Sequence, residues 1–121
     1  MLVDVLLDVN IPKKVKKMNS GRRVLHIGDI DTCMDDEDIL HIMSKFGCLL
    51  VTHDRNLALR AAKKYKTLFI KEPIAAEGII FCLEKNKKLL KTASIFCENG
   101  IECQNCNNVT FLGSPLRREG T

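Results

Sequence analysis

The hydrophobic pattern centres on a short apolar run, residues 48–51, which ends abruptly at Thr52, His53 and Asp54. Four consecutive apolar residues are too few for a helix and are typical of a strand buried on both faces of a parallel sheet. A helical pattern follows over residues 56–65. A strand that ends in a carboxylate and turns into a helix places that carboxylate where open α/β sheets bind their ligands. Asp54 is therefore the first candidate for a functional site.

The rest of the chain alternates short apolar runs with helical periodicity. We expect further strands at residues 1–7, 24–27 and 67–70, and further helices at residues 12–18, 35–46 and 73–91. This alternation predicts an α/β fold with a mostly parallel sheet flanked by helices. We expect one α/β domain over residues 1–91. A short Cys-containing C-terminal extension should follow at residues 92–121, with a disordered tail at 115–121.

The composition narrows the class of protein. A chain of 121 residues with 45% apolar and 28% charged residues fits one soluble globular domain. The net charge of +4 permits a polyanionic partner without requiring one. Basic residues gather at 13–23 and acidic residues at 29–38, which suits either a metal site that handles phosphate or two solvated faces. We see no secretory signal and no membrane-spanning run, so we expect a cytoplasmic protein with no membrane contact.

Three acids stand where expected strands end or helices begin: Asp8, Asp36 and Asp54. A parallel sheet brings such ends to one edge, and clustered carboxylates repel one another unless a cation lies between them. Carboxylate oxygens favour Mg²⁺ or Mn²⁺. Each acid also has a purely structural interpretation, because Asp36 could cap a helix and Asp8 could belong to the turn before Pro12. Together the three predict a magnesium or manganese site.

These acids lie in motifs that resemble the PIN-like nuclease superfamily. The chain carries a leading hydrophobic-Asp-x-Asn-x-Pro at residues 7–12, a central Asp-x-x-Ile at 36–39 and a closing Thr-x-Asp at 52–54. The resemblance covers roughly residues 2–71. Residues 54–57, together with Cys103-x-x-Cys106-Asn107, also resemble the mut-seven C-terminal branch, in which a zinc ribbon follows a PIN-like domain.

The resemblance implies a PIN-like fold and a Mg/Mn-dependent endoribonuclease that cleaves RNA. Asp8, Asp36 and Asp54 would hold the metal as the catalytic residues, while Asn10 and Thr52 would orient carboxylates or water, with His53 as a further supporting residue. Lysines of the first helix and of residues 85–91 would contact the RNA backbone. A protein partner such as an antitoxin, and self-association into a homo-oligomer, stay open.

The chain also departs from the family pattern. Asn56 stands where many relatives carry another acid, and Val9 stands where they often carry Glu. Loss of an acid weakens a metal position, so a catalytically weak or inactive binding module is the alternative. The first acid could be Asp4 instead of Asp8, because the two lie on the same face of a strand.

The six cysteines are expected to be thiols or metal ligands, as in other cytoplasmic proteins. Cys103 and Cys106 have the spacing of half a zinc site, and Cys97 could supply a third ligand. Cys82 or a second subunit could provide the fourth ligand that a structural zinc ion needs. A Cys97–Cys103 disulfide and unligated thiols are the alternatives.

Overall fold

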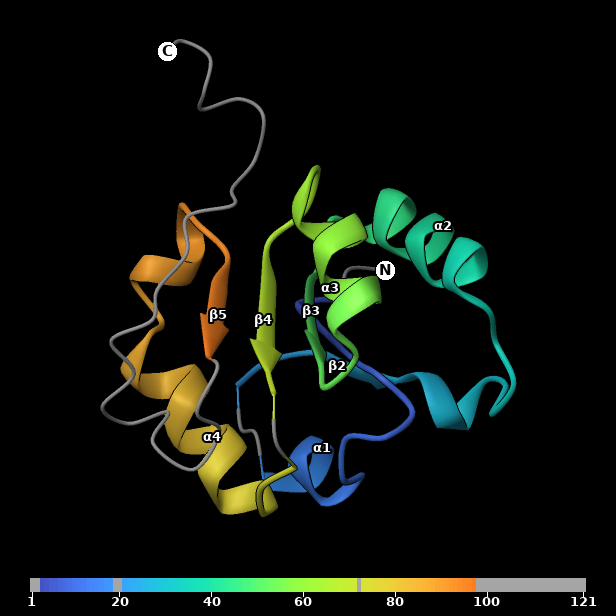
Figure 1. Cartoon of the computed structure of the whole chain (residues 1–121). Coiled ribbons are helices and arrows are strands. Elements are labelled where there is room, and N and C mark those ends of the chain that lie inside the picture. The colour runs from blue at the N-terminus through green and yellow to red at the C-terminus, as the bar shows by residue number, and fades with distance from the viewer. Residues whose placement is uncertain (1–2, 19–20, 72, 98–121) are drawn as a thin grey trace, which may run out of the picture.

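A computed structural model describes residues 3–18, 21–71 and 73–97 (Figure 1). In this part of the chain, short strands alternate with helices, in the order β1 (Val5–Leu7), α1 (Lys14–Met18), β2 (Val24–His26), η1 (Ile27–Asp29), α2 (Asp36–Phe46), β3 (Leu49–Thr52), α3 (Arg55–Ala62), β4 (Thr67–Ile70), α4 (Ala76–Lys85), η2 (Leu89–Lys91) and β5 (Ile95–Cys97). The α/β prediction is confirmed. No helix among these elements is long and apolar enough to cross a membrane.

The five strands form one parallel sheet in the order β2-β1-β3-β4-β5. β1 lies between β2 and β3, so the chain leaves β1 toward one edge and later continues from β3 toward the other. β5 pairs with β4 through Leu68 and Ile95, which extends the sheet beyond residue 91. The sequence had placed residues 95–97 in the C-terminal extension, and the structure makes them an edge strand.

Two helix layers cover the sheet. Residues that alternate along each strand separate cleanly into two groups: Leu68 and Ile70 face α1 and α4, whereas Phe69 faces α3. α2 and α3 share one hydrophobic cluster with the other face of the strands. This alternation follows from the period of two along a strand, so β1, β3, β4 and β5 are buried on both sides, while the edge strand β2 is only half-buried.

The crossover from β4 through α4 to β5 has the opposite hand to the other three crossovers. The steps from β3 to β4 and from β4 to β5 move across the sheet in the same direction. However, α3 covers one face of the sheet in the first step, and α4 covers the other face in the second. Crossovers between parallel strands nearly always share one hand. The exception places α4 beside α1.

The ends of α2 follow the sequence closely. Asp35 is the N-cap, and its side chain accepts a hydrogen bond from the backbone N–H of Asp38 at 3.0 Å. Asp36 is the first helical residue, which leaves its carboxylate available for other contacts. Gly47 ends the helix with φ of 62°, a left-handed conformation that glycine adopts without steric cost. The chain then enters β3 directly.

Candidate active site

The first and third strands end side by side, and each is followed by a candidate acid. Leu7 pairs with Val51 in the register of β1 and β3, so Asp8 and Thr52 come next on adjacent strands. Asp8 is buried, with 5% of its surface exposed, while Asp54 is exposed. The carboxyl ends of these strands lie at the switch in strand order, which is where open α/β sheets bind ligands.

Thr52 links the two acids through its hydroxyl group. Thr52 Oγ1 donates a hydrogen bond to Asp8 Oδ2 at 2.6 Å and accepts one from the backbone N–H of Asp54 at 2.9 Å. The backbone N–H of Val9 donates to the other oxygen, Asp8 Oδ1, at 2.7 Å. Both oxygens of the buried carboxylate therefore have donors, which satisfies a group that would be costly to bury alone.

Asp54 has a structural role as the N-cap of α3. Its Oδ1 accepts hydrogen bonds from the backbone N–H groups of Asn56 at 3.0 Å and Leu57 at 3.2 Å. Capping fixes the side chain at the positive end of the helix dipole. Oδ2 of Asp54 accepts no hydrogen bond from the described residues, so it is the oxygen left for a ligand.

Asp36 joins this edge from the start of α2. The pKa of its carboxyl group is raised, first by partial burial and then by the negative charge of Asp54, with Asp8 adding to the effect. Arg60 on α3 opposes the shift, since its Nη1 lies 3.6 Å from Asp36 Oδ2. The three predicted acids thus influence one another electrostatically. Asp36 lies on the same side of the sheet as Asp54.

The donor chemistry of the three carboxylates fits Mg²⁺ or Mn²⁺. No three His, Cys, Asp or Glu side chains in the described part of the chain are grouped as a metal-binding cluster. Asp8, Asp36 and Asp54 therefore do not form a ready three-ligand metal site among the described residues. Mg²⁺ is usually held by one or two carboxylates and several waters, so a closed protein cage is not required.

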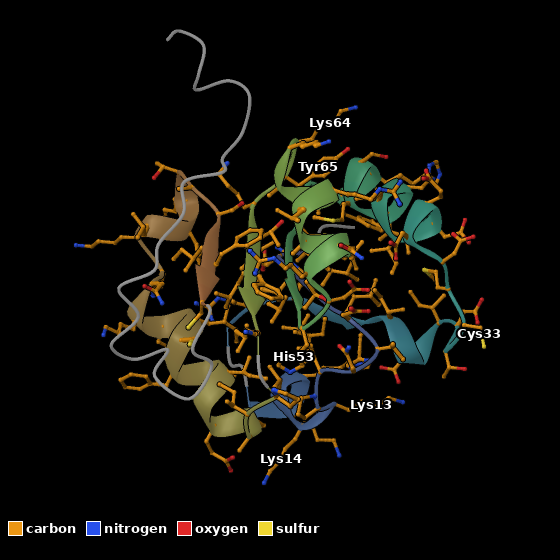
Figure 2. The ribbon with its side chains drawn as sticks, viewed as in Figure 1. Lys13, Lys14, Cys33, His53, Lys64 and Tyr65 are labelled. Carbon is orange, nitrogen blue, oxygen red and sulfur yellow. The ribbon has the colours of Figure 1, made fainter. Side chains whose placement is uncertain are left out.

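His53 follows the end of β3 and makes its contact with the neighbouring strand β4. Its Nδ1 lies 2.7 Å from the carbonyl oxygen of Ile70, which can only accept, so Nδ1 carries the proton. Nε2 is buried and has no hydrogen-bond partner among the described residues. Figure 2 shows His53 at the end of the strands that lies nearer α1. It supports the strand ends and is separate from the carboxylate contacts described above.

The other supporting candidates lie on the surface. Asn10 and Asn56 are exposed, and neither side chain makes a hydrogen bond with the described residues. Asp4, the alternative first acid, accepts a hydrogen bond from the backbone N–H of Arg23 at 2.9 Å. It precedes β1, at the opposite end of this strand from Asp8. The geometry therefore favours Asp8 as the acid nearest Asp54.

Arg60 is the one contributor that the sequence patterns did not single out. From α3, it contacts Asp36 of α2 and also forms an ion pair with Glu37 of α2. The pattern of α3 does place Arg60 away from the buried Leu57 and Ala61, but an exposed arginine is ordinary. Only the packing of α2 against α3 reveals its partners.

Most lysines of α1 already have acidic partners. Lys16, together with Lys13 just before the helix, forms ion pairs with Asp29 at 2.8 and 3.0 Å, and Lys14 lies 3.4 Å from Glu77. Their charge is thus partly compensated within the protein. The expectation that this helix contacts RNA stays a prediction, with less free positive charge to support it.

The zinc prediction falls mainly outside the described residues, where Cys103 and Cys106 lie. Cys97 is buried at the end of β5, and Cys82 is buried on α4 in the same hydrophobic cluster. Cys82 is a disulfide cysteine, which argues against a thiolate ligand at this position. Zinc binding by Cys97, Cys103 and Cys106 stays a prediction.

Comparisons with protein-family models, with curated proteins and with solved structures gave no match. The fold defines the class, a five-stranded parallel α/β protein, and the site must be interpreted from its own residues.

Proposed function

We propose that this protein is a metal-dependent endoribonuclease with a PIN-like fold, in which Asp8, Asp36 and Asp54 form the catalytic carboxylate cluster. The observation that supports this most is the link between Asp8 and Asp54 through the Thr52 hydroxyl group at the carboxyl ends of two adjacent strands. The pKa of Asp36 is raised by burial and by the charges of Asp54 and Asp8. A divalent cation would relieve that repulsion. Mg²⁺ or Mn²⁺, when bound, would supply an acidified water and neutralise charge on the phosphodiester.

The protein residues would have distinct tasks in this site. Thr52 holds Asp8 in a fixed orientation through the 2.6 Å hydrogen bond. The helix cap holds Asp54 with Oδ2 directed away from the backbone donors. Arg60 brings a permanent positive charge to the same edge, where it suits a phosphate group. The result is a preorganised set of charges, the kind that stabilises phosphoryl transition states.

The second candidate function is a non-catalytic module that binds RNA or protein. Two observations favour it. Arg60 already neutralises part of the charge on Asp36, and the described residues hold no closed group of metal ligands. Asn56 also favours the non-catalytic module, because many members of the family that the chain resembles carry an acid at this position.

A cleavage assay with matched variants tests the proposal. With Mn²⁺ or Mg²⁺, the parent should cleave single-stranded RNA, and Asp54→Asn should slow cleavage on the order of a thousandfold. Asparagine is as good an N-cap as aspartate, so the fold should be kept. Asp38→Asn is the control, because Asp38 lies on the first turn of α2 and is exposed.

The results separate the two candidates. Loss of activity in Asp54→Asn and full activity in Asp38→Asn would support the nuclease. Equal rates for the parent and Asp54→Asn would trace the activity to a contaminant. No cleavage by the parent across several RNAs, with no thermal shift on adding Mn²⁺, would favour the non-catalytic module.

A further inference from the structure

A cavity of about 430 Å³ lies between α2 and the C-terminal half of α3. Glu37, Leu40 and His41 of α2 line one side, and Arg60, Lys63 and Lys64 line the other. Tyr65, the only tyrosine in the chain, follows α3 and also lines the cavity. The volume is in the range that holds a small molecule or one nucleotide.

The lining of this cavity carries three cationic side chains and one acid, Glu37, which pairs with Arg60. Arg60 is paired with acids of α2, but Lys63 and Lys64 form no ion pair with the described residues. In contrast, Lys14 and Lys16 of α1, and Lys13 just before it, each have an acidic partner. The free lysines are exposed. An anion would therefore be attracted to this cavity more strongly than to α1.

The cavity is connected to the carboxylate edge through one side chain. Arg60 lines the cavity and also lies 3.6 Å from Asp36. Figure 2 shows Lys64 and Tyr65 at the end of the sheet opposite His53, so the cavity lies along α3 from the strand ends. From its cap at Asp54 to Ala62, α3 rises about 12 Å at 1.5 Å per residue. A short segment of a polynucleotide can cover that length.

We propose that this cavity binds one nucleotide of a single-stranded RNA substrate, with Lys63 and Lys64 contacting phosphate and Tyr65 stacking on an unpaired base. Stacking on an aromatic ring requires a base that is not paired, so the cavity favours single strands over duplexes. The identity of the strand rests on the proposed ribonuclease function. The binding itself requires neither metal nor cleavage.

Binding of a fluorescent single-stranded RNA is measured in a chelator, with the Asp54→Asn protein. The double variant Lys63→Ala/Lys64→Ala should weaken binding about tenfold. It should also make the slope of log affinity against log salt shallower by about 1.4, since each phosphate contact on a single strand contributes about 0.7. Lys87→Ala/Lys88→Ala is the comparison: it removes the same charge from exposed lysines just after α4, in the segment that the family resemblance predicts to contact RNA. Because Lys87 is already paired with Glu84, the cavity proposal expects the smaller loss of binding in this variant.

Tyr65 is tested with two variants. Tyr65→Phe keeps the ring and should bind like the parent, whereas Tyr65→Leu should lose about tenfold, in line with the cost of removing one stacked base. Thermal melting of both variants checks that the half-buried position still folds. If Tyr65→Leu lowers the melting temperature sharply, Tyr65→Met, which has a long apolar side chain without a ring, takes its place and should show the same tenfold loss.

The inference is overturned if the parent does not bind RNA, if it binds a duplex as tightly as a single strand, or if the two lysine pairs have equal effects. It is also overturned if Tyr65→Leu binds as tightly as Tyr65→Phe. RNA binding without any cleavage would count against the nuclease proposal and leave the cavity supported. If the Lys63 and Lys64 changes leave cleavage unaffected, the nuclease proposal stays supported and the cavity proposal is contradicted.

Discussion

The hydroxyl group of Thr52 lies 2.6 Å from Asp8 Oδ2 and connects the ends of two adjacent strands inside the protein. Thr52 is fully buried, and Asp8 nearly so. The same hydroxyl oxygen accepts the backbone N–H of Asp54. One small side chain thus sets the position of the buried acid and the start of α3.

Replacing Thr52 with valine should therefore affect both stability and function. Thr52→Val keeps the shape but removes the donor to a buried carboxylate, which should cost about 1–3 kcal/mol of unfolding free energy. Thr52→Ser keeps the hydroxyl and should cost less. Urea denaturation of the three proteins measures the difference. Equal midpoints for Thr52→Val and the parent would show that the hydrogen bond contributes nothing net.

Asp36 should destabilise the protein at neutral pH when no divalent cation is present. Because its pKa is raised above 3.8 in the folded state, chiefly by burial and by Asp54, the charged form is disfavoured by folding. The penalty is present above the raised pKa and absent below the unfolded value of 3.8. In chelator, Asp36→Asn should therefore melt higher than the parent at pH 7, with the gap closing toward pH 4.

Adding Mn²⁺ should reverse that order if Asp36 helps to bind a cation. The melting temperature of the parent should then rise as Mn²⁺ fills the site, and that of Asp36→Asn should rise less. A parent that melts above Asp36→Asn in chelator at pH 7 would show that the Arg60 contact outweighs the repulsion.

Asp29 should have the opposite pH dependence. Hydrogen bonds from Lys16 and Lys13 lower the pKa of its carboxyl group from 3.8 to about 2. The stabilisation is therefore complete above about pH 4 and is lost as the pH falls toward 2. Asp29→Asn should melt slightly below the parent at neutral pH, with the difference vanishing near pH 2. Because the pairs are exposed, high salt should also remove the difference.

Asn56→Asp tests whether the candidate metal site is weakened by a missing acid. The new carboxylate would lie in the first turn of α3, where a negative charge suits the helix dipole, next to Asp54. Mn²⁺ affinity should rise severalfold, and any cleavage activity should rise with it. The control is Asn86→Asp, at the C-cap of α4, which should change neither. An unchanged affinity in Asn56→Asp would place the cation away from the start of α3.

The apolar runs and helix signals of the sequence were sufficient to predict the parallel α/β class and the helix of residues 36–46 with its glycine end. Asp8 and Asp54 could be placed at strand ends because Asp8 follows a short apolar run directly and Asp54 follows another after only Thr52 and His53. β5 was missed as a strand of the sheet, since three apolar residues beside a cysteine-rich segment carry little periodicity. Whether Asp35 or Asp36 caps α2 depends on one rotamer, which the sequence left open.

Contacts between elements were beyond the reach of the patterns. Arg60 acquires its role only because α3 packs beside α2, and the ion pairs of Lys13 and Lys16 depend on where η1 places Asp29. The cavity beside Tyr65 likewise exists only between two packed helices. The strand order, and the face of the sheet that α4 covers, depend on which packing of the complete set of elements has the lowest free energy. A local sequence pattern does not contain that information.

The opposite-handed crossover has a consequence for how the chain folds. α4 covers the face of β1, β3 and β4 that carries Leu7, Val51 and Ile70, so the part of the chain up to β4 cannot bury that face alone. A nascent chain that ends after β4 would expose it to water, and α1 would lack its neighbour. We therefore expect folding to wait until residues 76–97 have left the ribosome, and a fragment ending at residue 71 to aggregate or bind chaperones.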